Sequence, residues 1–346
     1  MKHAFTIFII FLAAGALISI LAIVFNLKSF GSSLPKGEGG IFLSENGKIF
    51  KKVSATSGLE ITSVLFSKIY PRRVYIGTKK YGLWISEDAG NTFSQVSPRT
   101  LNIDVYDIFE NTEGNVYLAV YGNKRGSVIF LPATPVGIEE NKSREIYFSL
   151  IERFGVFGIT AQNGTLVIIS SDGGVYASHN NGKSWELKSR LPDEGLLKLA
   201  AKKNSGTIWV LTSENRILRS DNLGKEWHDV SPQKKLFAVP RINNIFYDQR
   251  SGALVVSSDK IYKSVDEGNS WEALNLLLPP DQIPISAAGI NPDNAQMIYA
   301  GSGNILYKSI DGGTSWSFIK LPISKNISTI SFEPNDPRIT IIGTSR

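Results

Sequence analysis

An eight-residue motif, Ser-x-Asp/Asn-x-Gly-x-x-Trp/Phe, recurs five times and constrains the fold of this chain more than any other feature. We call it the box. Its defining residues are Ser86, Asp88, Gly90 and Phe93; Ser178, Asn180, Gly182 and Trp185; Ser220, Asn222, Gly224 and Trp227; Ser264, Asp266, Gly268 and Trp271; and Ser309, Asp311, Gly313 and Trp316. A shortened copy begins at Ser44. Copies begin about 45 residues apart, or twice that between the first two full boxes, and this period is typical of four-stranded propeller blades.

Each repeat has the same predicted strand pattern. In the first complete repeat, short apolar segments at Ile61–Phe66, Val74–Thr78, Gly82–Ile85 and Phe93–Val96 predict four strands, and the box connects the third to the fourth. Glycine at the fifth position of the box permits a positive φ. The Asp or Asn side chain accepts backbone N–H groups across the turn, and the Ser hydroxyl adds a further bond. We expect the final aromatic residue to enter the core and staple its own hairpin.

The count of repeats predicts an all-β, seven-bladed β-propeller whose last blade is shared by the two ends of the folded part. Ile327–Phe332 and Ile339–Gly343 supply the first two strands of that blade, and Gly40–Leu43 and Ile49–Val53 supply the other two. This pairing closes the ring and removes two free sheet edges. The other blades are predicted at 60–98, 103–152, 155–188, 196–230, 241–274 and 285–320, of which 103–152 lacks a box.

The N-terminal segment predicts a membrane anchor in residues 1–25. Ala4 to Phe25 contains no charged residue, and as a helix it would be roughly 33 Å long, enough to cross a bilayer. A cleaved signal peptide is the alternative, although its apolar region is usually only about 7–15 residues long. Residues 26–39, rich in Gly, Ser, Pro and Lys, predict a flexible linker before the propeller at 40–346. We expect a single-pass protein of the cytoplasmic membrane with its propeller on the extracytoplasmic side.

Composition excludes several function classes. The 37 Lys and Arg residues nearly balance 31 Asp and Glu, giving a net charge of +6, which is too even for a nucleic-acid-binding domain. The absence of Cys excludes disulfides, thiolate metal sites and Cys nucleophiles. One Asp in each box offers too few oxygens for calcium, and the folded part has only His179 and His228 as imidazole ligands. We therefore predict no metal and no cofactor.

The box resembles the Asp-box, or BNR repeat, of sialidases, some glucan hydrolases, sortilin-type receptors and the photosystem II stability/assembly factor. A single seven-bladed ring behind an N-terminal apolar segment is most similar to the photosystem II stability/assembly factor group, and more distantly to sortilin-type and sialidase-type propellers. The Phe/Tyr-Arg-Ile-Pro motif that precedes the first box of sialidases is absent here. The resemblance implies a non-enzymatic propeller that mediates protein–protein interaction as an assembly or scaffolding factor.

Cationic residues predict where a partner would bind. In a propeller, links between second and third strands lie on the same face as links between blades, whereas the boxes lie on the opposite face. The residues that this mapping gathers on one face are Lys79, Lys80, Lys124, Arg125, Lys234, Lys235 and Arg241. We call them the predicted basic rim. They would attract an acidic or membrane-embedded protein partner.

A glycan-binding or glycan-cleaving propeller of the sialidase type is the alternative. Glycoside hydrolysis requires two carboxyl groups that face each other across the substrate. The carboxylates that fall on or near innermost strands are Asp104, Asp107, Glu60, Asp193, Glu194 and Asp281. An arrangement of two of them across the channel would favour this alternative.

Overall fold

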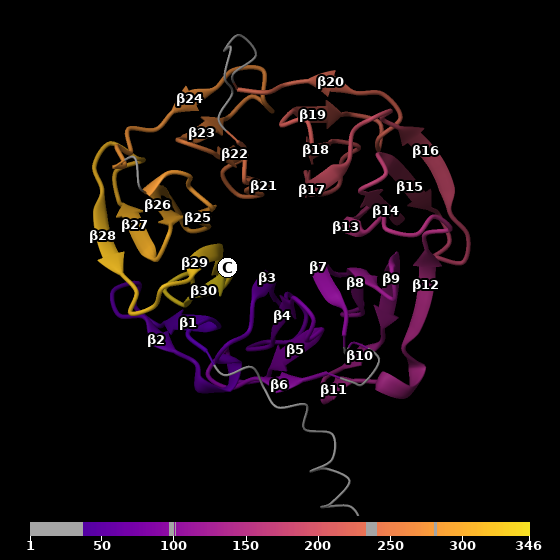
Figure 1. Ribbon diagram of the computed structural model, residues 1–346, viewed down its shortest axis with the longest axis horizontal. Helices are drawn as coiled ribbons and strands as arrows, with labels where there is room; N and C mark the ends of the chain where they lie inside the picture. Colours follow the sequence, from indigo (N-terminus) through magenta and orange to yellow (C-terminus); the bar gives the residue numbers. More distant parts are fainter. Residues whose placement is uncertain (1–36, 97–99, 101, 233–240, 280–281) are drawn as a thin grey trace, which may run out of the picture. The chain divides into compact units, whose positions relative to one another are not determined.

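The computed structural model describes residues 37–96, 100, 102–232, 241–279 and 282–346, and Gly37–Arg346 forms one compact unit. Seven four-stranded antiparallel sheets surround a central axis in this unit (Figure 1). The helices described in full are the short 3-10 turns η1 (Ser54–Thr56) and η3 (Glu140–Lys142). The prediction of an all-β, seven-bladed propeller is therefore confirmed.

The blades are numbered here from the first that lies wholly within one stretch of chain. Blade 1 contains β3 (Ile61–Phe66), β4 (Val74–Thr78), β5 (Leu83–Ser86) and β6 (Ser94–Gln95), and blade 2 contains β7 (Asp104–Glu110), β8 (Val116–Gly122), β9 (Arg125–Leu131) and β12 (Arg144–Phe148). Blade 3 contains β13 (Val156–Gln162), β14 (Thr165–Ser170), β15 (Gly174–Ser178) and β16 (Glu186–Arg190), and blade 4 contains β17 (Leu196–Ala201), β18 (Ile208–Thr212), β19 (Ile217–Ser220) and β20 (His228–Asp229). Blade 5 contains β21 (Asn244–Tyr247), β22 (Leu254–Ser257), β23 (Ile261–Ser264) and β24 (Glu272–Ala273), and blade 6 contains β25 (Ala287–Asn291), β26 (Asn294–Ser302), β27 (Ile305–Ser309) and β28 (Ser317–Lys320).

Blade 7 joins the two ends of the folded unit, as predicted. It contains β29 (Asn326–Phe332), β30 (Thr340–Ser345), β1 (Ile41–Ser44) and β2 (Lys51–Lys52), in that order from the axis outward. The strands β1 and β30 are antiparallel, with Ile41 opposite Gly343 and Leu43 opposite Ile341. The hydrophobic core lies between neighbouring sheets. One cluster, for example, combines Leu43 of blade 7 with Ile76 of blade 1.

Every full box forms the same hydrogen-bonded turn. In the box of blade 3, the Ser178 hydroxyl donates to Asn180 Oδ1 (3.0 Å) and accepts from the Gly182 backbone N–H (2.9 Å). The same amide oxygen of Asn180 accepts from the Ser184 N–H (2.9 Å). These three contacts recur in the other four full boxes at 2.7–2.9 Å. The predicted roles of the Asp/Asn and Ser residues are confirmed.

The aromatic residue of the box also makes a contact that the sequence did not predict. The indole N–H of Trp185 donates to the Ile146 carbonyl oxygen (2.8 Å), which belongs to the outer strand of the preceding blade. Trp271 donates in the same way to the Val230 carbonyl oxygen (2.8 Å), just beyond β20 of blade 4. Both tryptophans pack against core clusters, as expected, and in addition their indole groups hold two blades together.

Blade 2 lacks a box, but the connection between its outer strands makes an equivalent contact with blade 1. This connection contains the short strands β10 (Ala133–Thr134) and β11 (Gly137–Ile138). The Tyr70 hydroxyl of blade 1 donates to the Ala133 carbonyl oxygen (2.9 Å). The buried Arg73 guanidinium donates to the Pro135 carbonyl oxygen (3.2 Å) and pairs with Glu87 (2.8 Å). A different sequence thus serves the same inter-blade function.

The predicted anchor (residues 1–25) and most of the predicted linker (26–39) lie outside the described residues. Among residues 37–346, apart from the four short gaps, no helix is long and apolar enough to cross a membrane. Gly37 and Gly39 belong to the compact unit, because their carbonyl oxygens accept hydrogen bonds from Lys52 Nζ (3.0 Å) and the Gly58 N–H (2.9 Å). The compact unit therefore begins three residues before the expected start of the propeller.

Candidate functional site: a basic hollow on the box face

The propeller has two faces that differ in the turns they carry. The boxes and the turns between first and second strands lie on one face, which we call the box face. The links between second and third strands and the links between blades lie on the other, which we call the link face. This division follows from the antiparallel order of strands in each blade.

The described members of the predicted basic rim lie on the link face, but at separate places. Lys79 and Lys80 are exposed in a turn of blade 1, and Lys124 is exposed in the corresponding turn of blade 2. Arg125 is paired with Glu145 (3.0 Å). Arg241 lines a pocket at the link-face end of the channel, and Lys234 and Lys235 lie outside the described residues. The rim's role in binding stays a prediction.

The channel pocket at the link face has a volume of about 340 Å³. Tyr106 and Phe157 line it, with ring centroids 4.1 Å apart, together with Lys198. Nearby, the Asp107 carboxylate accepts the N–H groups of Ile108 (2.9 Å) and Ile159 (3.0 Å), which joins blade 2 to blade 3. Burial raises the pKa of Asp107 to about 6, and the two hydrogen bonds to its carboxylate offset part of this increase. Burial lowers the pKa of Lys198.

Three of the other channel carboxylates considered for glycoside chemistry also have partners. Glu60 pairs with Arg346 (3.0 Å), and Glu194 pairs with Arg216. Asp104 accepts from the Lys80 N–H (2.9 Å) and from the Tyr106 hydroxyl (3.2 Å). Asp193 is exposed on the link face, and Asp281 lies outside the described residues. In the part of the chain that the structure describes, no group of three His, Asp or Glu residues could hold a metal ion.

A larger hollow of about 620 Å³ lies on the box face. It is built from the regions where the first strand turns into the second in five successive blades. One lining residue from each of these regions, in blade order, is Lys68, Asn111, Gln162, Lys203 and Gln249. The sequence did not reveal this site, since these turns share no motif and become neighbours only through the curvature of the ring.

The hollow is positively charged. Its cationic side chains are Lys68, Arg144, Lys183 and Lys203, and its carboxylates are Glu110 and Glu113. No described carboxylate forms an ion pair with any of the four cations. Glu110 instead accepts hydrogen bonds from the Ser67 hydroxyl (2.5 Å) and the Lys68 N–H (2.7 Å).

Although Lys68 is exposed, desolvation by the neighbouring residues of the hollow lowers the pKa of its ammonium, and the nearby positive charge of Lys203 lowers it further. Glu110 opposes this change. Two ammonium groups that repel each other across a hollow would both be stabilised by an anion placed between them.

Amide side chains supply most of the other polar groups of the hollow. They are Asn111, Asn115, Gln162, Asn163, Asn181, Asn204 and Gln249. Gln162 is only 2% exposed, and its side-chain oxygen has no hydrogen-bond partner among the described residues. A buried acceptor without a partner is unfavourable by about 1–3 kcal/mol, so a ligand that donates a hydrogen bond to it would be favoured.

An apolar wall accompanies these polar groups. Tyr117 packs edge-on against Phe130, with ring centroids 5.1 Å apart, and the Arg144 guanidinium lies 4.4 Å from the Phe130 ring centroid. All three residues line the hollow. The hollow therefore combines an aromatic surface with cations and amides, an arrangement typical of sites for small or extended ligands.

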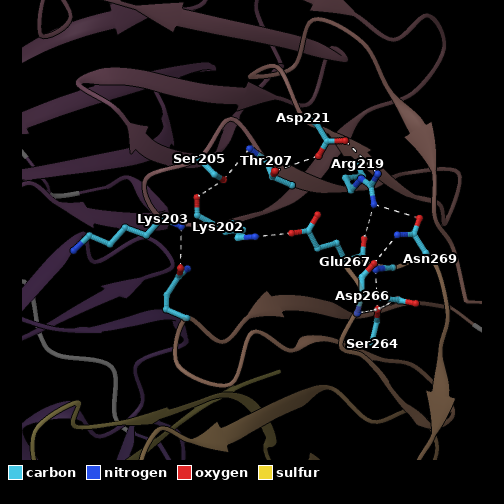
Figure 2. A network of polar contacts seen from close by, with 12 residues as sticks. Lys202, Lys203, Ser205, Thr207, Arg219, Asp221, Ser264, Asp266, Glu267 and Asn269 are labelled. Atoms are coloured by element: carbon cyan, nitrogen blue, oxygen red, sulfur yellow. Dashed lines mark hydrogen bonds and ion pairs between the residues drawn. The ribbon is translucent and has the colours of Figure 1, made fainter.

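A polar network between blades 4 and 5 positions one side of the hollow (Figure 2). Lys202 Nζ pairs with Glu267 (2.6 Å), and the Lys203 N–H donates to the side-chain oxygen of Gln249 (2.8 Å). Figure 2 shows the Lys202 and Lys203 side chains extending in opposite directions. Lys202 thus closes the seam between the blades, while Lys203 is free to line the hollow.

Comparisons with known proteins give a likeness of structure only. No family model matches the chain, and no curated protein matches it. Among solved structures, one described as YCF48 bound to D1 peptide is 14% identical, with a TM-score of 0.65 over 91% of this chain and 100% of the other. YCF48 from Cyanidioschyzon merolae is 14% identical, with a TM-score of 0.65 over 85% of this chain and 98% of the other.

A GH74 xyloglucanase from Xanthomonas campestris is 15% identical, with a TM-score of 0.68 over 90% of this chain and 52% of the other. Identities this low show the fold and leave activity and partners open. The chain therefore shares the propeller fold of YCF48 and of the GH74 enzyme, which confirms at the level of fold its resemblance to the photosystem II assembly-factor group.

Proposed function

We propose that this protein is a membrane-tethered propeller that binds an acidic peptide segment of a protein partner in the box-face hollow, as an assembly or scaffolding factor. The observation that carries the proposal is the union of four cations without ion pairs and the unpartnered oxygen of Gln162. A peptide with acidic side chains has carboxylates that can pair with the four cations, and backbone N–H groups that can donate to the Gln162 oxygen.

The similar propeller described with a bound D1 peptide supports this proposal, since the same fold there receives a peptide. The apolar segment at residues 4–25 supports the tether. The proposed binding face differs from the one expected from the sequence. The acidic segment is proposed to bind the box face, whereas the predicted basic rim lies on the link face.

The experiment measures fluorescence anisotropy of labelled octapeptides, one rich in Asp and Glu and one of neutral polar residues, against the full chain in detergent. We expect the acidic peptide to bind and its affinity to fall as salt is raised, because screening weakens exposed ion pairs. The double variant Lys68→Gln/Lys203→Gln should weaken binding about tenfold, a change of roughly 1.4 kcal/mol. Gln162→Met should weaken it without changing the salt dependence.

Lys225→Gln is the matched control, since Lys225 is an exposed lysine in the box of blade 4 that does not line the hollow. Equal losses in the control and in the double variant would contradict the site, and no binding of any acidic peptide would contradict the function.

A glycan ligand is the second candidate, favoured by the amides and by the partly exposed Phe130 in the hollow wall. Neutral oligosaccharides that bind independently of salt, and that Lys68→Gln/Lys203→Gln leaves unaffected, would identify this alternative. Turnover of such an oligosaccharide would further identify an enzyme.

A further inference from the structure

A cluster of exposed apolar side chains lies in the link between blades 2 and 3. Leu150 is 89% exposed, Ile151 is 52% exposed and Phe148 is 47% exposed. Ser149 between them is buried; its N–H donates to the Gly126 carbonyl oxygen (2.8 Å) and its hydroxyl donates to the Ile151 carbonyl oxygen (2.9 Å). We call residues 148–151 the apolar tip. Because its backbone is fixed by these bonds, its side chains are held in solvent by the fold.

Cationic residues surround the apolar tip. The Arg153 N–H donates to the Lys124 carbonyl oxygen (2.7 Å), and the Arg125 guanidinium lies 4.5 Å from the Phe148 ring centroid. Lys124 and Arg153 form no ion pair with any described carboxylate, although Glu152 is exposed beside Arg153. Apolar side chains that project beyond a surrounding set of Lys and Arg are typical of surfaces that enter the interface of an anionic bilayer.

The start of the compact unit lies on the same face. A Cβ atom added at Gly37 would lie 3.3 Å from Gly58 Cα, and Gly58 belongs to the link between β2 and β3. Links between blades lie on the link face, as does the apolar tip. The chain therefore enters the propeller from this face. A Gly/Ser-rich linker of the predicted length would span on the order of 20 Å, short enough for the link face to reach the bilayer.

We propose that the link face docks directly on an anionic lipid bilayer, with Leu150 and Ile151 inserted among the headgroups and Lys124 and Arg153 in contact with lipid phosphates. This orientation leaves the box face, with its hollow, turned away from the membrane. The proposal uses the predicted anchor but does not depend on the peptide-binding function.

The absence of Cys from the natural sequence permits a clean test by spin labelling. Full-length Leu150→Cys is labelled and reconstituted into vesicles of phosphatidylglycerol and phosphatidylcholine. Power-saturation spectroscopy then measures access of the label to oxygen and to a water-soluble nickel chelate. We expect a label that oxygen reaches and nickel does not, at a depth of about 5–10 Å into the headgroup region of the bilayer. Lys124→Gln/Arg153→Gln in the same background should raise nickel access.

Val136→Cys is the control, because Val136 is 95% exposed and lies on the box-face connection of blade 2. Its label should remain fully accessible to nickel. Equal nickel access at positions 150 and 136 overturns the proposal. Shielding of position 150 from both nickel and oxygen also overturns it, since a protein surface would then cover the tip. Peptide binding measured in detergent should be the same for Leu150→Cys and the unmodified protein, so the two proposals can fail independently.

Discussion

Gly40 and Thr344, 304 positions apart, form a reciprocal set of hydrogen bonds that closes the ring. The Thr344 N–H donates to the Gly40 carbonyl oxygen (3.1 Å), the Gly40 N–H donates to Thr344 Oγ1 (2.9 Å), and this hydroxyl donates to the Gly40 carbonyl oxygen (3.0 Å). Within the continuous chain of blade 1, Thr78 makes two of the same bonds to Gly82. Its N–H donates to the Gly82 carbonyl oxygen (3.0 Å), and so does its hydroxyl (2.7 Å). The closing blade thus rebuilds an ordinary turn from two chain ends.

Replacing Thr344 by Val should destabilise this closure. The substitution keeps the shape of the side chain but leaves the buried Gly40 N–H without its acceptor, which costs about 1–3 kcal/mol. Urea unfolding followed by tryptophan fluorescence measures the loss. Thr78→Val is the control: it should cost less, because no backbone N–H donates to the Thr78 hydroxyl among the described contacts. An unchanged midpoint for Thr344→Val would contradict the role assigned to this residue.

Trp271→Phe should weaken the contact between blades 4 and 5. The phenylalanine keeps most of the apolar contact but leaves the Val230 carbonyl oxygen without the indole donor, at a cost of about 1–2 kcal/mol. Trp316→Phe is the matched variant, since the Trp316 indole donates to Gly313 in its own box (3.1 Å). The prediction fails if thermal unfolding shows equal losses for the two variants.

Gly268→Ala should destabilise the protein more than Gly164→Ala. Both glycines have positive φ, +94° and +79°, so both substitutions introduce backbone strain of about 1 kcal/mol or more. A Cβ at Gly268 would also lie 3.0 Å from Val230 of the preceding blade, whereas nothing lies within 4 Å at Gly164. Denaturant midpoints of the three proteins give the comparison, and equal losses at the two glycines would show that contact with Val230 is unimportant.

Ionisation of Asp107 should make stability depend on pH. Its pKa in the folded protein is raised to about 6 by burial, above the ordinary value of 3.8, so the folded state binds more protons than the unfolded state between these values. Stability therefore falls as pH rises from about 4 to about 6, by roughly 2–3 kcal/mol, and stays lower above that range. Asp107→Asn should remove this slope. Urea unfolding at several pH values tests it, and a slope equal to that of the unmodified protein would exclude Asp107 as its source.

The sequence predicted those features that depend on residues close together in the chain. The box specifies its own turn, and the spacing of its copies specifies the number and closure of the blades. The direction of Trp185 could not be predicted in this way, because its acceptor at Ile146 belongs to another repeat and is reached only after the blades pack. The pairing of Arg125 with Glu145 likewise depends on the register of two strands.

The hollow was beyond prediction for a related reason. Lys68, Gln162 and Lys203 occupy turns of unlike sequence in three different blades, and no local pattern marks any of them. Only the angle between adjacent sheets, which the side chains between them determine, brings these turns together. Sites assembled from several repeats are therefore poorly predicted even where the fold itself is clear.

The indole hydrogen bonds of Trp185 and Trp271 both join a later repeat to an earlier one. During synthesis, each new blade can therefore dock on a neighbour that is already complete. The exception is the pair β1 and β2, which leaves the ribosome first but has no inner partner until β30 has been made. The first strands of the propeller to be made must therefore wait for the last, so the final step of its assembly is the pairing of β1 with β30.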